Sequence, residues 1–397
     1  MTRDTARLKF ICRLGYGDAL PKDEDNSGDI PVFGSNGQYS TTVTRNTEAP
    51  AIVVGRKGSY GKVNWAPNGC FASDTTFFID YRQTSSNLRW LYWALQTLRL
   101  DEGSQEAAVP GLNRESVYEQ RVLWPDAANQ VLIANYLDRE TARIDALVAE
   151  KNRMLALLEE KRASLIIRAV TRGLNPDAPF KSSGLNWLGD IPAHWGIPPV
   201  YARFEVQLGK MLDEKKIKGT HLASYLRNAD VQWGVINVLN LPVMDFDDES
   251  RIRYSLKPGD ILVCEGGEIG RSAIWNGEIG ECYYQKALHR LRSLNGNDDA
   301  SFFIFVMRAL VSLCVFSSQA LAATIQHLPA EKLRNIRYPS PPLSEQKAIV
   351  SFLNKEIAYI DGVSEEIDMS IQLLKERRAA LITAVVTGQI PIEEMTE

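Results

Sequence analysis

Apolar residues recur at intervals of seven along two long stretches of the chain. The later stretch repeats leucine or isoleucine at one heptad position, namely Leu353, Ile360, Ile367, Leu374 and Leu381. The earlier stretch has the same spacing, with Lys151 interrupting the series, at Leu137, Ile144, Leu158 and Leu165. A seven-residue apolar period predicts a helix with one seam for a partner helix, as in a coiled coil. The core-facing side of an ordinary helix can show a similar stripe, so the period alone leaves both interpretations open.

Neighbouring residues indicate where a second apolar row would run. Ile349 and Val363 lie beside the row of the later stretch, and Leu147 and Met154 lie beside that of the earlier one. Helices of about 42 residues would be ~63 Å long, at 1.5 Å per residue. Such helices are longer than the core of one globular part requires, so we predict that they pair with each other.

The two stretches are copies of one sequence. Sliding the chain by 216 residues places residues 130–171 on 346–387 without a gap, and 17 of the 42 paired positions are identical. Upstream, Pro125 falls on Pro341 and Leu112 falls on Leu328. A register kept over this length indicates an internal duplication. An antiparallel pair of such helices would make the repeat a pseudo-twofold axis, with one globular part at each end.

A weaker repeat, which needs small gaps, links the globular parts. TARLKFICRLG (5–15) is similar to VYARFEVQLG (200–209), and APAIVVGRKGSYGKVNW (49–65) is similar to PGDILVCEGGEIGRSAIW (258–275). Glycine, proline and serine between the halves, at 172–184, indicate a linker. The predicted organisation is a globular part, a helix, a second globular part, a second helix and a short tail, over 1–126, 127–174, 175–343, 344–390 and 391–397.

Composition limits the class of protein. With 397 residues, 45% of them hydrophobic and 24% charged, the chain suits two or three globular domains. The apolar stretch around Phe302–Val315 contains Arg308 and is too short to cross a bilayer, so we expect no membrane partner. A net charge of −4 argues mildly against bulk polyanion binding but permits local basic patches.

The five cysteines are widely spaced, and no pair has the spacing of a metal knuckle. The N-terminus carries no signal-peptide pattern. We therefore expect reduced core thiols in a cytoplasmic protein, at Cys12, Cys70, Cys264, Cys282 and Cys314.

Each globular part has an apolar strand that runs into a glycine-rich turn with basic residues. In the first part the turn offers Arg56, Lys57, Ser59, Tyr60 and Lys62, and in the second it offers Arg271. Glycines let a backbone approach a phosphate, and cations supply the countercharge. A hairpin with solvated charges explains the same residues equally well. Glu265 and Glu268 weaken the phosphate interpretation in the second turn.

Three further polar clusters are candidates for contacts with DNA. They are Ser35, Asn36, Gln38 and Tyr39; then Lys215, Lys216 and Lys218; and finally Gln285, Lys286 and His289. Asparagine and glutamine can read adenine, and arginine or lysine can read guanine. Taken singly, each of these side chains is also what an ordinary protein surface carries.

No enzyme signature appears in the sequence. The turn GRKGSYGKV is not a P-loop, because the glycine spacing differs and Val63 stands where serine or threonine would bind magnesium. The four histidines are scattered, and no Asn-Pro-Pro-Tyr tetrapeptide of amino-methyltransferases occurs. We therefore predict neither a catalytic residue nor a metal site on this chain. The polar clusters favour a non-catalytic chain that binds DNA. Two alternatives to this interpretation remain, namely a bivalent coiled-coil adaptor between proteins and an enzyme with an unrecognised site.

Several segments resemble one family. SGLNWLGDIPAHW (183–195) is similar to the signature that opens a target-recognition domain in specificity subunits of type I restriction-modification systems. QVLIANYLDRETARIDALV and PPLSEQKAIVSFLNKEIAYIDGV resemble the two central helices of that family. The resemblance implies an α+β chain in which two mixed α/β target-recognition domains are separated by an antiparallel coiled coil. Each domain would read half of a bipartite site in double-stranded DNA.

The resemblance also implies partners. Two modification subunits would carry S-adenosylmethionine and methylate adenine, and restriction subunits would use ATP and magnesium to translocate and cut DNA. The specificity chain itself would hold no cofactor. One departure is the absence of a WLGDIPAHW copy before the first domain, which implies either a shortened first domain or a start downstream of the natural one.

Overall fold

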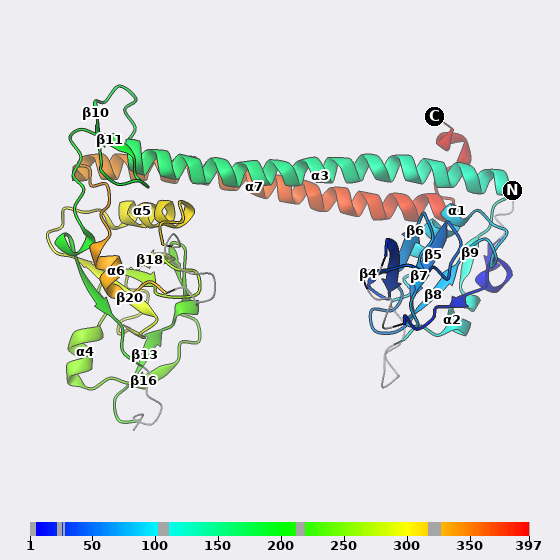
Figure 1. Cartoon of the computed structure of the whole chain (residues 1–397), viewed down its shortest axis with the longest axis horizontal. Helices are drawn as coiled ribbons and strands as arrows, with labels where there is room; N and C mark the ends of the chain where they lie inside the picture. Colours follow the sequence, from blue (N-terminus) through cyan, green and yellow to red (C-terminus); the bar gives the residue numbers. More distant parts are fainter. Residues whose placement is uncertain are drawn as a thin grey trace. The chain divides into compact units, whose positions relative to one another are not determined.

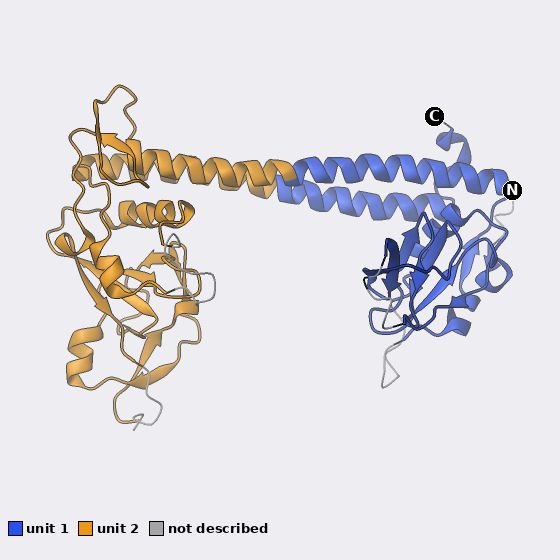
Figure 2. Ribbon diagram, in the orientation of Figure 1, with its two compact units in different colours: residues 1–152, 367–397 blue, residues 153–366 orange. Residues whose placement is uncertain are grey.

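The computed structural model describes residues 5–21, 26, 28–101, 111–211, 219–316 and 327–396. It divides into two compact units, the first formed by residues 1–152 with 367–397 and the second by residues 153–366 (Figures 1 and 2). The long helices are α3 (Ala127–Arg172) and α7 (Leu343–Val386). Each helix contributes one half to each unit, so the compact units cut across the predicted domain boundaries.

Unit 1 contains two main sheets. The four-stranded sheet has the order β2 (Gly15–Tyr16), β8 (Thr76–Ile79), β5 (Ala51–Gly55) and β6 (Val63–Ala66). The three-stranded sheet has the order β4 (Gly37–Thr42), β3 (Ile30–Gly34) and β7 (Phe71–Ala72). A further pair and two short helices complete the unit, namely β1 (Thr5–Arg7) with β9 (Arg121–Leu123), α1 (Leu88–Gln96) and α2 (Arg114–Glu119).

Unit 2 repeats this topology. Its four-stranded sheet has the order β12 (Phe204–Leu208), β20 (Leu288–Ser293), β17 (Ile261–Cys264) and β18 (Ser272–Ile274). Its three-stranded sheet has the order β16 (Val243–Asp245), β13 (Leu222–Leu226) and β19 (Tyr283–Tyr284). In both units the last pairing of the smaller sheet is parallel, β3 with β7 and β13 with β19. The predicted fold class of two repeated α/β domains with paired long helices is confirmed.

Unit 2 also has elements of its own. They are the pair β10 (Phe180–Ser182) and β11 (Asp190–Pro192), the pair β14 (Val231–Gln232) and β15 (Val235–Ile236), and the helix α4 (Asp248–Tyr254). The helices α5 (Ala300–Ser312) and α6 (Ala330–Asn335) correspond to α1 and α2 of unit 1. The predicted tail contains one 3₁₀ turn, Ile392–Met395, and Met395 packs into the core of unit 1.

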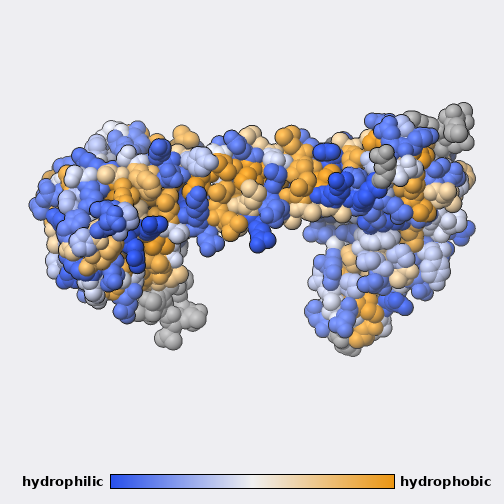
Figure 3. Space-filling model, turned by 90° about the horizontal axis from the view of Figure 1, so that it is seen from above, coloured by the Kyte–Doolittle hydropathy of each residue, from blue (hydrophilic) through white to orange (hydrophobic). Residues whose placement is uncertain are grey.

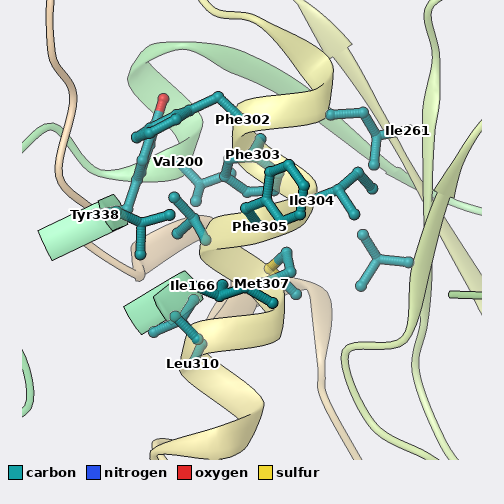
Figure 4. Close-up of a cluster of buried hydrophobic side chains, with 14 of the residues drawn as sticks. Ile166, Val200, Ile261, Phe302, Phe303, Ile304, Phe305, Met307, Leu310 and Tyr338 are labelled. Carbon is teal, nitrogen blue, oxygen red and sulfur yellow. The ribbon is translucent and has the colours of Figure 1, made fainter. Parts of the chain in front are cut away.

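The core of unit 2 forms around α5. Its side chains from Phe302 to Met307 are buried between the sheet and the long helices, with Ile166 of α3 beside them (Figure 4). Phe303 meets Tyr338 edge to face, with ring centroids 5.2 Å apart. The most apolar stretch of the sequence is therefore a core helix. Among the described residues, no helix combines the length and apolar character needed to cross a membrane.

A glutamine joins each domain to the first turns of its long helix. Gln130 accepts the backbone N–H of Asn87, the N-cap of α1, at 2.8 Å, and its amide donates to the Pro125 carbonyl at 2.8 Å. Gln346 accepts the N–H of Asp299, the N-cap of α5, at 2.8 Å and donates to the Pro341 carbonyl. Both glutamines are buried. The repeat seen in sequence thus carries equivalent hydrogen bonds.

The long helices pair antiparallel in each unit. In unit 1, Arg378 Nε lies 2.9 Å from Asp145 Oδ1, and in unit 2, Arg162 Nη2 lies 3.0 Å from Asp361 Oδ1. Along the predicted seam, Leu137, Ile144, Leu353, Ile360 and Ile367 are buried, whereas Leu158, Leu165, Leu374 and Leu381 are half-buried.

In α7 the second row of the seam runs as expected, because Ile349 is buried and Val363 is half-buried, but in α3 it differs from the expected one. Leu147 and Met154 are 53% and 44% exposed, so they lie outside it. The row instead runs through Thr141, Val148 and Leu155, which are buried or half-buried at the heptad spacing that complements the first row. Lys151 is half-buried, on the same row as Ile144.

Both helices end slightly before their predicted limits of 174 and 390. Gly173 follows α3 with φ +72°, and Gly388 lies just beyond α7 with φ +69°. Positive φ favours glycine and ends the helix there. Four of the five free cysteines are buried, but Cys314 is exposed, because it follows the last turn of α5, so the expectation of a core thiol is wrong for this residue.

Candidate nucleic-acid interface

Three loops of unit 1 meet at one edge of its sheets. They are the β3–β4 turn (35–36), the glycine-rich turn after β5 (56–62) and the loop between β7 and β8 (73–75). The backbone N–H of Arg56 donates to the Thr75 carbonyl at 2.9 Å, and Lys62 Nζ donates to Asn36 Oδ1. A shallow pocket of about 400 Å³ opens between the first and third loops. Two of the polar clusters predicted separately therefore lie together.

Unit 2 brings the corresponding three loops together. They follow β13, β17 and β19, at residues 227–230, 265–271 and 285–287. The N–H of Glu265 donates to the Ala287 carbonyl at 3.0 Å, and Arg271 Nη2 donates to the Asn228 carbonyl at 2.9 Å. We call each set of three loops the three-loop face of its unit.

Backbone hydrogen bonds establish which residues of the two faces correspond. Gly61 and Gly270, with φ of +82° and +81°, donate to the carbonyls of Gly55 and Cys264. Lys62 and Arg271 follow these glycines, so they are equivalent cations on equivalent turns. Leu112 N–H donates to the Arg56 carbonyl at 2.8 Å, and Leu328 N–H donates to the Glu265 carbonyl at 2.7 Å. The sequence match of Leu112 with Leu328 is thus a match in structure.

Most of the predicted DNA-contacting residues of unit 1 reach the surface of this face. Exposed side chains are Asn36, Gln38, Tyr39, Lys57, Ser59 and Lys62, while Arg56 and Tyr60 are half-buried. The Arg56 guanidinium lies 5.0 Å from the ring centre of Tyr16, which fixes its direction.

Ser35 has another role. It is 7% exposed, and its hydroxyl donates to the Thr75 carbonyl at 2.6 Å. Its one donor is already used inside the protein, so the structure favours a positioning role for Ser35 over a contact with DNA. Ser35 ties the first loop of the face to the third.

In unit 2 only some of the predicted residues are accessible. Lys286 is exposed, and Arg271 and Gln285 are half-buried. His289 is fully buried in β20, between β12 and β17, and its Nε2 lies 2.7 Å from the Leu328 carbonyl. This burial favours a structural role for His289 over a contact with DNA. Burial also holds the pKa of His289 below its ordinary value. Lys215, Lys216 and Lys218 lie outside the described residues.

Sequence reasoning missed the contribution of the segment between β13 and β16. Arg227 pairs with the buried Asp230 at 2.8 Å, and Trp233 Nε1 donates to Glu268 at 2.5 Å. The first half of the chain has a two-residue turn here, so the repeat gave no signal. The unit 2 face therefore combines cations, amides and carboxylates, whereas the turn 56–62 of unit 1 carries cations without acids.

These groups have the chemistry of a nucleic-acid interface. Lysine, arginine, asparagine and glutamine can donate to phosphate oxygens or base edges, and a carboxylate can accept from the amino group of cytosine. No cluster of three or more potential metal ligands occurs in the described part of the chain.

Comparison with known proteins agrees with this geometry. The sequence model for the type I restriction modification DNA specificity domain matches residues 3–155 and 204–369. The specificity subunit of type I restriction enzyme EcoBI from Escherichia coli is 26% identical over 361 residues, covering 87% of this chain and 75% of that protein. The EcoDI specificity subunit, from the same species, is 20% identical and covers 99% of this chain and 90% of its own.

Solved structures show the same fold. A chain from a study of the complex assembly and conformational transition of the type I R-M system superposes with a TM-score of 0.70 at 14% identity, with 98% of both chains covered. The HsdS subunit from Thermoanaerobacter tengcongensis gives a TM-score of 0.55 at 15% identity, covering 98% of this chain and 97% of that one. With the match to the domain model over both halves, the chain belongs to the family of DNA specificity subunits of type I restriction-modification systems, which recognise a DNA sequence and are not themselves catalytic.

Proposed function

We propose that each three-loop face reads one half of a bipartite target in double-stranded DNA. One observation carries this proposal: both faces are built from the same three loops at equivalent strand ends, yet they present different exposed side chains. A common scaffold with different reading groups suits a target whose two halves differ. The face of unit 1, with Asn36, Gln38 and Lys62, has the donors for purine edges and phosphates.

The paired helices would fix the distance between the two half-sites. Half-sites read from one side of a duplex lie about one turn, ~34 Å, or a multiple of it apart. Paired long helices are stiff enough to hold such a spacing. A protein built this way requires a non-specific gap of constant length between the halves of its target.

The proposed partners are DNA, two modification subunits and the restriction subunits. Relatives are subunits of type I restriction enzymes, and the fold recurs in a structural study of type I complex assembly. Hydrophobic side chains are exposed along the long helices (Figure 3). Leu157 and Leu373, which are 55% and 65% exposed, occupy equivalent positions in the repeat. Exposed apolar groups at two equivalent positions support docking of two copies of one partner.

Cofactors would lie on those partners rather than on this chain. S-adenosylmethionine would serve the modification subunits, and ATP with magnesium would serve the restriction subunits. The proposed site of action is the cytoplasm, where the target DNA is available to the assembly.

The deciding experiment maps methyladenine in genomic DNA from cells that express the chain with its modification subunit. We expect a two-part motif with a fixed non-specific gap, and the motif should vanish when the chain is omitted. A continuous palindrome would contradict the two-face arrangement. Binding of the modification subunit without salt-dependent binding of any DNA would instead point to a protein adaptor.

A further inference from the structure

Unit 2 contains a polar pocket beside its long helices. Its volume is about 410 Å³, and it opens between α5, α7 and the end of β18. Its walls include Ile274, Ser301, Ile304, Phe305 and Asn354. Arg162, Arg308 and Asp361 supply charge at its rim.

In unit 1 a cluster of large side chains occupies the corresponding space. The Arg89 guanidinium lies over three rings, at 4.8 Å from Trp65, 4.6 Å from Tyr92 and 5.0 Å from Trp93. Arg89 Nε also donates to Asp138 Oδ1 at 2.7 Å, and Trp93 Nε1 donates to the same oxygen at 2.8 Å. These contacts leave Arg89 with a carboxylate partner and a stacked environment.

The hydrogen bonds of the fold show that these positions correspond. The N-caps Asn87 and Asp299 align α1 with α5, so that Arg89 matches Ser301, Tyr92 matches Ile304 and Trp93 matches Phe305. Strand pairing matches Trp65 with Ile274, because they face the equivalent residues Ile52 and Ile261. The helix repeat matches Asp138 with Asn354. Each residue of unit 2 is smaller or uncharged, and the pocket is the space that results.

Two arginines of the pocket keep hydrogen-bond donors that the described residues do not use. Arg162 pairs with Asp361 at 3.0 Å, but the Nε atoms of Arg162 and Arg308 have no hydrogen-bond partner among the described residues. Arg308 stands where unit 1 has the neutral Gln96. Burial holds the pKa of Arg308 below its ordinary value, with a further contribution from the charge of Arg162. The carboxylates of Asp361, Glu159 and Glu268 act on the pKa of Arg308 in the opposite direction.

This arginine also lies next to the three-loop face of unit 2. The Arg308 guanidinium is 5.2 Å from the ring centre of Trp233, and Trp233 Nε1 donates to Glu268 of the turn 265–271. A neighbouring pocket is lined by Trp233, Glu268 and Arg308 together. An anion held at Arg308 would therefore sit one side chain away from the groups proposed to read bases.

We propose that this pocket binds a phosphate of the DNA backbone beside the half-site read by unit 2. The inference rests on the proposed function of the three-loop faces. Guanidinium, amide and hydroxyl groups are the side chains that contact DNA phosphates, and Arg308, Asn354 and Ser301 provide one of each. The contact positions the duplex and carries no sequence information. Unit 1 lacks it, because Arg89 and Asp138 neutralise each other in the same place.

The test measures binding of the assembled methyltransferase to duplexes with and without its methylation motif, over a series of salt concentrations. Arg308→Ala should lower affinity for both duplexes by a similar factor, roughly tenfold at physiological salt, and should reduce the slope of log K against log salt by about 0.9. Arg308→Lys keeps the charge and should restore most of the slope. Arg378→Ala, at the unit 1 position that matches Arg162, is the control and should leave the slope unchanged.

A second variant closes the pocket without removing Arg308. Ser301→Arg with Asn354→Asp installs the pair found in unit 1 and adds no net charge, so it should reduce the slope as Arg308→Ala does. An unchanged slope in both variants would overturn the phosphate site, and so would a loss confined to binding of the modification subunit. Preference for the motif duplex reports on the three-loop faces. If the variants still prefer the motif duplex and the salt slope is unchanged, the phosphate site is contradicted while the proposed function of the three-loop faces still stands.

Discussion

Arg378 Nε lies 2.9 Å from Asp145 Oδ1, and the internal repeat relates this ion pair to the one between Arg162 and Asp361. Adding 216 to 145 gives 361, and adding 216 to 162 gives 378, so each helix donates the acid in one pair and the base in the other. Such an exchange requires antiparallel helices, because a parallel pair would bring identical positions together. The duplicated sequence therefore supplies both the acid and the base of each of these two interhelical ion pairs.

Charge reversal tests whether these pairs help to fix the register. We expect Asp145→Arg to lower the free energy of unfolding, because it faces Arg378 with a like charge. Adding Arg378→Asp should recover about 0.3–1 kcal/mol, since the pair is partly exposed. Urea unfolding of the single and double variants measures the coupling. The pair Arg162–Asp361 is the matched comparison. If the single changes in unfolding free energy simply add in both pairs, the ion pairs do not help to fix the register.

Lys151→Ile should stabilise the paired helices. Lys151 is half-buried on the row of Ile144, and the equivalent residue of the other helix is the buried Ile367. Removing a charge and burying a branched side chain on the seam should raise the free energy of unfolding by about 1 kcal/mol. Lys161→Ile, at an exposed position of the same helix, is the control. Equal unfolding midpoints for both variants would place Lys151 outside the seam.

Gln346→Ala should destabilise unit 2 by about 1–3 kcal/mol, because it leaves the N–H of Asp299 and the Pro341 carbonyl without their partner. Gln130→Ala should have a similar effect on unit 1 through Asn87. Denaturant unfolding measures both. The exposed Gln389 offers a matched glutamine, whose replacement by alanine should change stability by less than about 0.5 kcal/mol.

His289 should make the stability of the protein depend on pH. Burial penalises the charged imidazole and holds its pKa in the folded state below the unfolded value of about 6.5. As the pH falls below that value the unfolded chain binds the proton first, so the free energy of unfolding decreases until the folded pKa is reached. The decrease is at most about 1.4 kcal/mol for each pH unit of that window.

His289→Phe should remove this dependence, because the equivalent residue of unit 1, Phe77, is also buried and cannot titrate. Unfolding of both proteins between pH 7 and pH 5 gives the difference directly. A difference that stays constant across this range would show that His289 does not titrate differently in the two states.

Exchange of residues 1–126 for the first domain of another specificity subunit should change one half of the methylated motif and leave the gap unaltered. The reason is that the loops at 35–36, 56–62 and 73–75 all belong to this segment, whereas the paired helices do not. Methyladenine mapping measures both features. A change in both halves would mean that the two faces do not read DNA independently.

The sequence determined the features that depend on local periodicity. The heptads, the repeat of 216 residues and the linker composition at 172–184 predicted two long helices, because each signal lies within one continuous segment. The second seam row was harder to predict. Leu147 is more apolar than Thr141, yet the direction of the partner helix decides that Thr141 is the buried one.

Only the tertiary structure decided how residues distant in sequence combine. Strand pairing brings Asn36, Lys62 and Thr75 to one edge, and it buries His289, whose neighbours Lys286 and Gln285 remain accessible. The pocket beside Arg308 depends on the sizes of side chains from four elements. In unit 1, Trp65, Arg89, Trp93 and Asp138 fill the equivalent space together. No single segment encodes that complementarity, because packing joins side chains whose separation along the chain carries no periodic signal.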